Sequence, residues 1–586
     1  MRLSVLPGFI AGLLVATTAA EGFSAEPSGT LPVLYIETPD HQPITSKETY
    51  ISNTSYWLDP KGDPEVEALG SKEAPLTMQI RGRGNYTWTG FDKKPYRLKL
   101  ESKQPIMGMD KSKHWALMAH ADDNLGFLRA PITFKLSELT GLAWTPQHRP
   151  LEVVLNGDYI GLYFLTQTVR VDKDRVDIVE QADNSDADVT GGWLLEIDNY
   201  QEENQLRMTE GDGSEMWITY KSPEVLCDAQ YQYLKGQMEA LNDAFYQQSP
   251  QSTDWEKLAD KEALAAYYLV QEMTDNYESF HGSCYFTRNA GADCLWTWGP
   301  VWDTGSTFMR DPGQFMYDSQ WHQTWIPQIV KFDSFKSAYT EAMKQFLDNH
   351  YGEVAPYIRN YAARIAEAAR HDAERWPQYG NPDVEADCAK ILSLWSNRVI
   401  WLAEQWGIEA DVPRASGIYL RGDMNGWGTD AAWEFTTTAT KGVYELTDVT
   451  LSGSFKIADK DWGSVNYGRA NNGSNPVADE PFLLTQGTDS QNMQADGSYV
   501  RVVFTMTDDG QATLLLSTEE ASIDGTELPS ATIQVSGNTV STTDGSTLRV
   551  YTLQGALTAC GSSVSLPAGM YIAVSSSCGA KKVAIK

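Results

Sequence analysis

The chain has 586 residues and a formal net charge of −32 at pH 7. This length exceeds what one hydrophobic core supports, so about three or four domains are expected. The acidic balance excludes the basic surface that non-specific binding to nucleic acid or anionic lipid needs, and it favours a cation or a neutral ligand.

The first residues resemble an export signal. Arg2 precedes an apolar stretch, Leu3 to Val15, which ends in the small residues 16–20. This pattern predicts a secretory signal peptide over residues 1–25. The stretch is too short to span a bilayer and nothing as apolar recurs, so we expect no transmembrane segment. The mature protein is then expected to be secreted, periplasmic or held at the cell surface.

Strand signals dominate from Leu31 to about Ile178, where short alternating apolar runs are broken by Gly, Pro and Asp. The segment from Leu151 to Phe164 predicts a hairpin. Asn156-Gly157 at its centre supplies the positive φ angles that a type I′ turn requires.

From about Gln230 the apolar spacing changes to three and four residues, which predicts helices. The last of these is expected to end at Trp406-Gly407. Strands followed by helices indicate an α+β domain, for which we expect the range 26–410.

After Pro413 the composition shifts to Gly, Thr, Ser and aromatic residues in short alternating runs. This predicts an all-β sandwich module over residues 414–517. A linker around Thr518 to Leu528 and a smaller β module over residues 529–586 follow, the last resembling C-terminal sorting or attachment modules. Among the six cysteines, Cys560 and Cys578 are expected to pair, and the other four lack the CxxC spacing of a zinc site.

Several segments carry a family resemblance, beginning with IRGRGNYTW at 80–88, KKPYRLKL at 93–100 and LNGDYIGLYFLTQTVRVDKDRVDI at 155–178. The order continues through GMDKSKHWALMA, TGLAWTP, GGWLLEID and GPVWDTG. Together they resemble the CotH kinase family from Pro32 to Gly407. The resemblance implies an atypical protein-kinase-like domain that uses ATP with Mg²⁺ or Mn²⁺ to phosphorylate Ser or Thr of exported proteins.

Phosphoryl transfer needs cations around the phosphates. Alternation places Arg97 and Lys99 on one strand face, and either Lys99 or Lys94 is the expected phosphate contact. Arg81 and Arg83 lie in a glycine-containing turn whose backbone could approach a phosphate. The alternative is an ordinary solvated strand face and a turn with two exposed arginines.

Asp303 in GPVWDTG follows an aromatic strand-like run, and its carboxylate is the expected metal ligand and catalytic group; the alternative is an Asp that caps a turn. By the resemblance, Asn276 is a second metal ligand and Glu278 the catalytic carboxylate, with Glu where the family has Asp. Gln167, placed with the nucleotide contacts, stands where the family usually shows Glu. Gly305 occupies a position often filled by Asp or Asn.

Within residues 417–468, YLRGDMNGWG, AWEF, FKIADKDW and NYG resemble the starch-binding-type modules of the SusE/SusF kind in exported Bacteroidetes proteins. Trp427 and Trp462 are candidate platforms for sugar rings, and Lys456 a candidate donor to their hydroxyls. The alternative is that these aromatic residues belong to the core of the module.

Two functions follow from these observations. The first is an exported CotH-like kinase acting on Ser or Thr of a secreted or surface protein. The second is a catalytically degenerate kinase-like surface protein that binds glycan through its β module, and the departures at Glu278 and Gln167 distinguish the two. No GxSxG or HExxH motif occurs, which disfavours an esterase or a metalloprotease.

Overall fold

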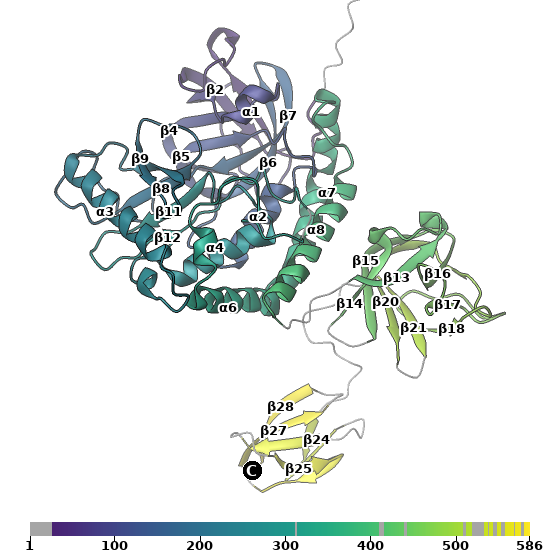
Figure 1. Ribbon diagram of the computed structural model, residues 1–586. Coiled ribbons are helices and arrows are strands. Elements are labelled where there is room, and N and C mark those ends of the chain that lie inside the picture. Colours follow the sequence, from purple (N-terminus) through teal and green to yellow (C-terminus); the bar gives the residue numbers. More distant parts are fainter. Residues whose placement is uncertain are drawn as a thin grey trace, which may run out of the picture. The chain divides into compact units, whose positions relative to one another are not determined.

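The computed structural model describes residues 26–310, 313–408, 415–438, 442–507, 511–518, 533–536, 538–542, 548–552, 557–567, 569–575 and 579–585. The predicted signal peptide, most of the predicted linker and Cys578 lie outside these residues. The chain divides into two units, one of residues 1–416 with 430–432 and 436–441, the other of residues 417–429, 433–435 and 442–586 (Figure 1). No helix within the described ranges has the length and apolarity needed to cross a membrane.

The first unit begins with a closed barrel in the order β1-β2-β3-β4-β5-β7-β6. Its strands are β1 Val33–Glu37, β2 Ile51–Asp59, β3 Leu76–Gly82, β4 Tyr96–Ile106, β5 Met109–Met118, β6 His148–Leu155 and β7 Asp158–Gln167. The barrel closes where β1 pairs in parallel with β6, whereas its other pairs are antiparallel. The predicted hairpin is confirmed, because β6 and β7 flank Asn156 (φ 53°) and Gly157 (φ 83°).

A second sheet has the order β12-β11-β8-β10-β9. Its strands are β8 Trp193–Asp198, β9 Gln205–Thr209, β10 Glu215–Ser222, β11 Cys284–Arg288 and β12 Thr297–Trp298. One large core joins this sheet to most of the helices, and it includes the fully buried indoles of Trp193, Trp255, Trp296 and Trp325. Since β11 and β12 follow two long helices, this sheet combines segments far apart in the sequence.

The helices of this unit are α1 Tyr86–Gly90, α2 Arg129–Leu139, α3 Asp228–Phe245, α4 Lys261–Met273, α5 Ile326–Ile329, α6 Asp333–Asn349, α7 Tyr351–Arg375 and α8 Val384–Gln405, with 3-10 turns η1 Pro39–His41 and η2 Asp254–Lys257. The expected end is confirmed, since Trp406 caps α8 and Gly407 has φ 64°. The unit therefore mixes strands and helices in the α+β order expected. Helix α2 falls inside the region assigned to strands; it is buried on most sides, so the one-sided apolar pattern that marks a surface helix is missing.

Helix α7 contacts the barrel through a buried charge. Asp372 Oδ1 accepts the Leu162 N–H of β7 at 2.8 Å and pairs with Lys93 Nζ at 2.7 Å. Gly161 is required beside it, because its φ is +106° and a Cβ there would lie 2.1 Å from Asp372 Oδ1. This contact fixes the barrel against the helices at the edge of the cavity described below.

The second unit contains a nine-stranded sheet in the order β13-β14-β15-β20-β21-β18-β17-β16-β19, with β13 also paired to β16. Its strands are β13 Ala415–Gly422, β14 Glu434–Thr437, β15 Val443–Leu451, β16 Ser454–Asp459, β17 Asn466–Gly468, β18 Phe482–Gln486, β19 Met493–Gln494, β20 Gly497–Met506 and β21 Ala512–Ser517, with 3-10 turns η3 Asp423–Asn425 and η4 Ala431–Trp433. Phe435, Phe455 and Phe504 are among the residues of its own apolar core.

The remaining strands form a three-stranded sheet, β22-β23-β26, and a four-stranded sheet, β25-β24-β27-β28. They are β22 Ile533–Ser536, β23 Thr539–Thr542, β24 Leu548–Thr552, β25 Leu557–Gly561, β26 Ser563–Ser565, β27 Gly569–Ser575 and β28 Gly579–Ile585. A small apolar cluster that includes Val540, Val550 and Ile585 forms their core.

Candidate active site

A cavity of about 1290 Å³ opens in the first unit. Its walls come from the turn after β3, the segment between β5 and α2, the edge of the β8–β10 sheet, and the loops that follow α4 and β12. Four large apolar side chains that remain exposed belong to its lining: Tyr86, Tyr200, Met309 and Trp321. The lining therefore combines polar and charged side chains with exposed apolar, partly aromatic ones.

Asp303 lies in the loop after β12 and is exposed to the cavity. Its Oδ1 accepts the Gly305 N–H at 3.1 Å, and its backbone carbonyl accepts the Asn276 side-chain amide at 2.9 Å. The loop is thus held by short local bonds, which use one carboxylate oxygen of Asp303. Such a carboxylate is a suitable ligand for a hard cation.

Asn276 follows α4 and is buried on the cavity wall. Its Nδ2 donates to Gln271 Oε1 at 2.9 Å as well as to the Asp303 carbonyl, which fixes the direction of the amide. Its Oδ1 is buried and has no hydrogen-bond partner. Because an orphaned buried oxygen is costly, this atom indicates an absent donor or cation.

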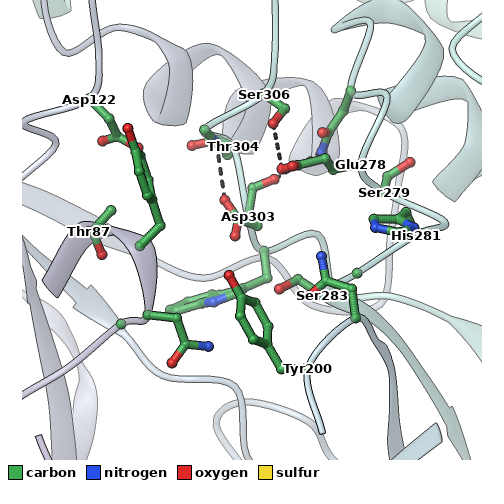
Figure 2. A pocket seen from close by; sticks show the side chains of 18 of the residues that line it. Thr87, Asp122, Tyr200, Glu278, Ser279, His281, Ser283, Asp303, Thr304 and Ser306 are labelled. Carbon is green, nitrogen blue, oxygen red and sulfur yellow. Dashed lines mark hydrogen bonds between the residues drawn. The ribbon is translucent and has the colours of Figure 1, made fainter. Parts of the chain in front are cut away.

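Glu278 lies beyond Asn276 on the same loop, and Ser306 Oγ donates a hydrogen bond to its Oε2. Burial raises the pKa of Glu278, and the nearby carboxylates of Asp303 and Asp122 raise it further, while the Ser306 hydrogen bond opposes them. Figure 2 shows Glu278 and Asp303 on the cavity wall with the Ser306 bond between the two loops. A carboxylate with a raised pKa is suited to accept a proton near neutral pH.

Asp122 completes this group and was missed from the sequence. It precedes α2, lines the cavity, and in the view of Figure 2 lies on the other side of Asp303 from Glu278. Burial raises the pKa of Asp122 to about 6, with additional contributions from Asp303 and Asp123. The sequence signal available was the polar run Asp122-Asp123-Asn124, which follows strand β5 after three intervening residues.

Asp123, the next residue, is structural. Its carboxylate accepts the N–H groups of Leu125 at 2.9 Å and Arg129 at 3.2 Å, and pairs with the Arg129 side chain at 3.5 Å. Arg129 in turn donates to the Gly305 carbonyl. The start of α2 is therefore tied directly to the Asp303 loop.

Arg83 is the predicted phosphate contact that lines the cavity. Burial and the neighbouring Arg97 lower its pKa to about 10, with Asp303 opposing them. Its guanidinium lies 5.7 Å from the centre of the Trp302 ring. Since even the lowered pKa is far above neutral, Arg83 brings a positive charge to the carboxylate wall.

The other five predicted phosphate contacts, all within the described ranges, do not line this cavity: Arg81, Lys94, Arg97, Lys99 and Gln167. The predicted alternation of β4 is correct, since its apolar residues are buried in the barrel and its cations are half-buried outside it. That outer face, however, pairs Arg97 with Arg81 across the ladder instead of facing the cavity. Lys94 donates to the Trp88 carbonyl at 2.7 Å, and Gln167 accepts the Gln147 N–H inside the barrel wall.

Lys93, the neighbour of Lys94, lines the cavity, as does Lys221. The Lys93 ammonium is buried, pairs with Asp372 at 2.7 Å and donates to the Leu162 carbonyl at 2.7 Å. Burial lowers its pKa, and Asp372 opposes that shift. The sequence places two lysines side by side, and only the packing decides which one points inward.

The donor set suits Mg²⁺ or Mn²⁺, because both prefer oxygen ligands and Mg²⁺ is usually held by one or two carboxylates with water and phosphate oxygens. Asp303, Asp122 and the Asn276 amide supply such atoms on one wall. In the described part of the chain, no three His, Cys, Asp or Glu side chains converge as a ready-made metal cage. The residues therefore fit a cation shared with a phosphate ligand.

In the β module, Trp427 and Trp462 have ring centroids 6.0 Å apart, and both adopt positive φ angles, 63° and 57°. The Arg421 guanidinium lies 4.2 Å from the centre of the Trp462 ring and donates to the Trp427 carbonyl. Positive φ is uncommon for bulky residues. Lys456 is buried, and its Nζ lies 6.0 Å from the Trp462 ring centre.

Comparison with known proteins gives one family. The model described as "CotH kinase protein" matches residues 80–402. No curated protein matches the chain. A solved structure titled "Ligand induced structure of AmyP-SBD" is 18% identical over 17% of this chain and 68% of its own, with a TM-score of 0.13, which is too low to support an argument.

Proposed function

This chain belongs to the CotH kinase protein family, and from that premise we propose that it is an atypical protein kinase that transfers phosphate from ATP to Ser or Thr of an exported protein. The observation that carries the proposal is the meeting of Asn276, Glu278 and Asp303 on one cavity wall with Arg83 beside them. These side chains come from three segments, the turn after β3 and the loops after α4 and β12, and together they supply the charges that phosphoryl transfer requires.

In the proposed reaction, the acceptor oxygen forms a bond to the γ-phosphorus while the bond from that phosphorus to the bridging oxygen breaks and ADP leaves. Glu278 takes the proton from the acceptor hydroxyl, which its raised pKa favours. Asp303 and Asn276 would hold Mg²⁺ or Mn²⁺, and such a cation supplies neutralising charge to the phosphates. Arg83 adds a fixed positive charge at the same wall.

The size and surround of the cavity support a macromolecular acceptor. Its volume of about 1290 Å³ exceeds the ~300–1,000 Å³ of ordinary small-molecule pockets, which leaves room for a nucleotide and part of a second substrate. The exposed side chains of Tyr86, Tyr200, Met309 and Trp321 offer apolar contact to a peptide segment. The predicted signal peptide supports an acceptor outside the cytoplasm.

The direct test measures ATP binding by isothermal titration with Mg²⁺ or Mn²⁺, and transfer of labelled γ-phosphate to the protein itself or to a generic acceptor. We expect the wild type to bind metal–ATP and Asp303→Asn to lose binding at least about tenfold with little change in melting temperature. A folded wild-type protein that binds no nucleotide with either metal would refute the proposal. A large loss of folded protein in Asp303→Asn would mean that Asp303 is a structural cap.

A second candidate is glycan binding by the β module, with or without kinase activity. Two half-buried tryptophans held at positive φ beside Arg421 support it, because such strain persists where surrounding structure fixes a functional geometry. Titration with starch-type oligosaccharides tests it, with Trp427→Ala expected to abolish binding. If the wild type binds no oligosaccharide, the contact between Trp427 and Trp462 is only a packing contact within the module.

A further inference from the structure

The space above Gly305 is the point where two carboxylates from different elements meet. A Cβ placed on Gly305 would lie 3.4 Å from Asp122 Oδ2 and 3.4 Å from Asp303 Oδ1. These are ordinary contact distances, and Gly305 does not have a positive φ, so the position is open because no side chain fills it. The two carboxylate oxygens thus face a common empty volume.

We propose that Asp122 is a ligand of the divalent cation, completing with Asp303 and the Asn276 amide oxygen a single cation site above Gly305. The inference rests on the proposed kinase function, because the phosphate that would share the cation is that of ATP. It assigns a metal-binding role to a residue between β5 and α2, far from the loops after α4 and β12 in the sequence.

The orphaned Asn276 Oδ1 is the observation independent of the carboxylates. Its amide nitrogen is committed to Gln271 and to the Asp303 carbonyl, so the amide cannot flip to give the oxygen a partner. The oxygen is buried, belongs to a residue that lines the cavity, and makes no hydrogen bond. A cation satisfies such an atom without any proton donor.

The carboxylates around Asp122 are only partly compensated by the cations Arg83 and Arg129. Asp122 Oδ2 and Asp303 Oδ1 lie at 3.4 Å from the same Cβ position on Gly305, and Asp123 is the next residue along the chain. Arg129 is already engaged by Asp123, Asn124 and the Gly305 carbonyl. Like charges held close together are stabilised by a bound cation, which would relieve the repulsion that the fold otherwise carries.

Arg129 explains how the fold keeps Asp122 at the Asp303 loop. It lies at the first position of α2, pairs with Asp123 next to Asp122, and donates to the carbonyl of Gly305 itself. The segment that carries Asp122 and the loop that carries Asp303 are therefore joined by one buried side chain. This fixed geometry is what a cation site shared by two segments requires.

The test titrates Mn²⁺ into the nucleotide-free protein and follows binding by electron paramagnetic resonance, a readout independent of activity. We expect Asp122→Asn to weaken Mn²⁺ binding at least about tenfold. Glu215→Gln removes a charge from another part of the lining and should leave Mn²⁺ affinity unchanged.

Unchanged Mn²⁺ affinity in folded Asp122→Asn would overturn the inference. The two proposals remain distinguishable. If Asp303→Asn loses metal–ATP and Asp122→Asn does not lose Mn²⁺, the kinase function stands and the Asp122 assignment falls. If Mn²⁺ binding depends on Asp122 but the wild type binds no ATP, the cation site stands and the kinase function falls.

Discussion

The barrel wall and the loop wall of the cavity hold their charges in opposite ways. On the barrel wall, Lys93 is fully buried and already neutralised by Asp372. On the loop wall, burial raises the pKa values of Glu278 and Asp122, and the nearby Asp303 carboxylate raises both further. Removing one partner of a buried ion pair leaves an uncompensated charge and destabilises the fold, whereas carboxylates with only partial compensation are available to a cationic ligand.

The largest expected effect comes from breaking the pair on the barrel wall. Lys93→Met removes the cation that pairs with the buried Asp372 carboxylate, which keeps its hydrogen bond from the Leu162 N–H. We expect the free energy of unfolding to fall by about 3–5 kcal/mol. Urea denaturation at pH 7 measures this. The matched control is Lys94→Met, which removes a single bond to the Trp88 carbonyl and should cost about 1 kcal/mol or less. Equal losses of unfolding free energy in Lys93→Met and Lys94→Met would contradict the view that the buried Lys93–Asp372 pair matters to the fold more than the Lys94 hydrogen bond does.

Asp387 in the first turn of α8 is a buried carboxylate that accepts a hydrogen bond from the Asn381 amide. It contrasts with Asp372, whose partner is the Lys93 ammonium. Burial raises the pKa of Asp387 from 3.8 to about 6. The folded state therefore prefers the protonated acid, so this group lowers stability as pH rises from about 4 to about 6 and adds no further change above that range.

We expect the free energy of unfolding of the wild type, relative to Asp387→Asn, to fall by about 1–3 kcal/mol across that window. Urea denaturation of both proteins at pH 4, 5, 6 and 7 gives the difference directly. A difference that is constant with pH would show that Asp387 ionises in the folded state as it does in water.

The smallest expected effect concerns Glu278 on the loop wall. Its longer arm reaches the Ser306 hydroxyl, and an Asp would lose that bond and draw back from the loop. We expect Glu278→Asp to keep metal–ATP affinity and to slow phosphate transfer by about tenfold or less, since a displacement of about an ångström lowers rates. Titration and single-turnover transfer assays separate the two effects. Faster transfer by the variant would mean that Glu278 is a degenerate residue and that Asp is the better base.

Local sequence determined several features of this protein. The type I′ hairpin at Asn156-Gly157 follows from the φ angles that those residues tolerate, and the alternation of β4 follows from the period of a strand. The end of α8 at Gly407 follows from helix-capping preferences. The motifs around Asn276 and Asp303 identified two of the loops that line the cavity, because each motif is a short continuous stretch of sequence that can be recognised without the fold.

Only the tertiary structure decided which charges share a site. The alternation of β4 shows which residues share a face, but not what each face contacts, and Arg97 and Lys99 lie outside the barrel. Lys93, just before β4, is buried against Asp372, 279 residues later in the chain. Asp122 reaches the Asp303 loop through Arg129, and no local pattern predicts a contact across that sequence separation. Burial and long-range pairing depend on how distant elements pack, and these set both the fold's ion pairs and the composition of the candidate site.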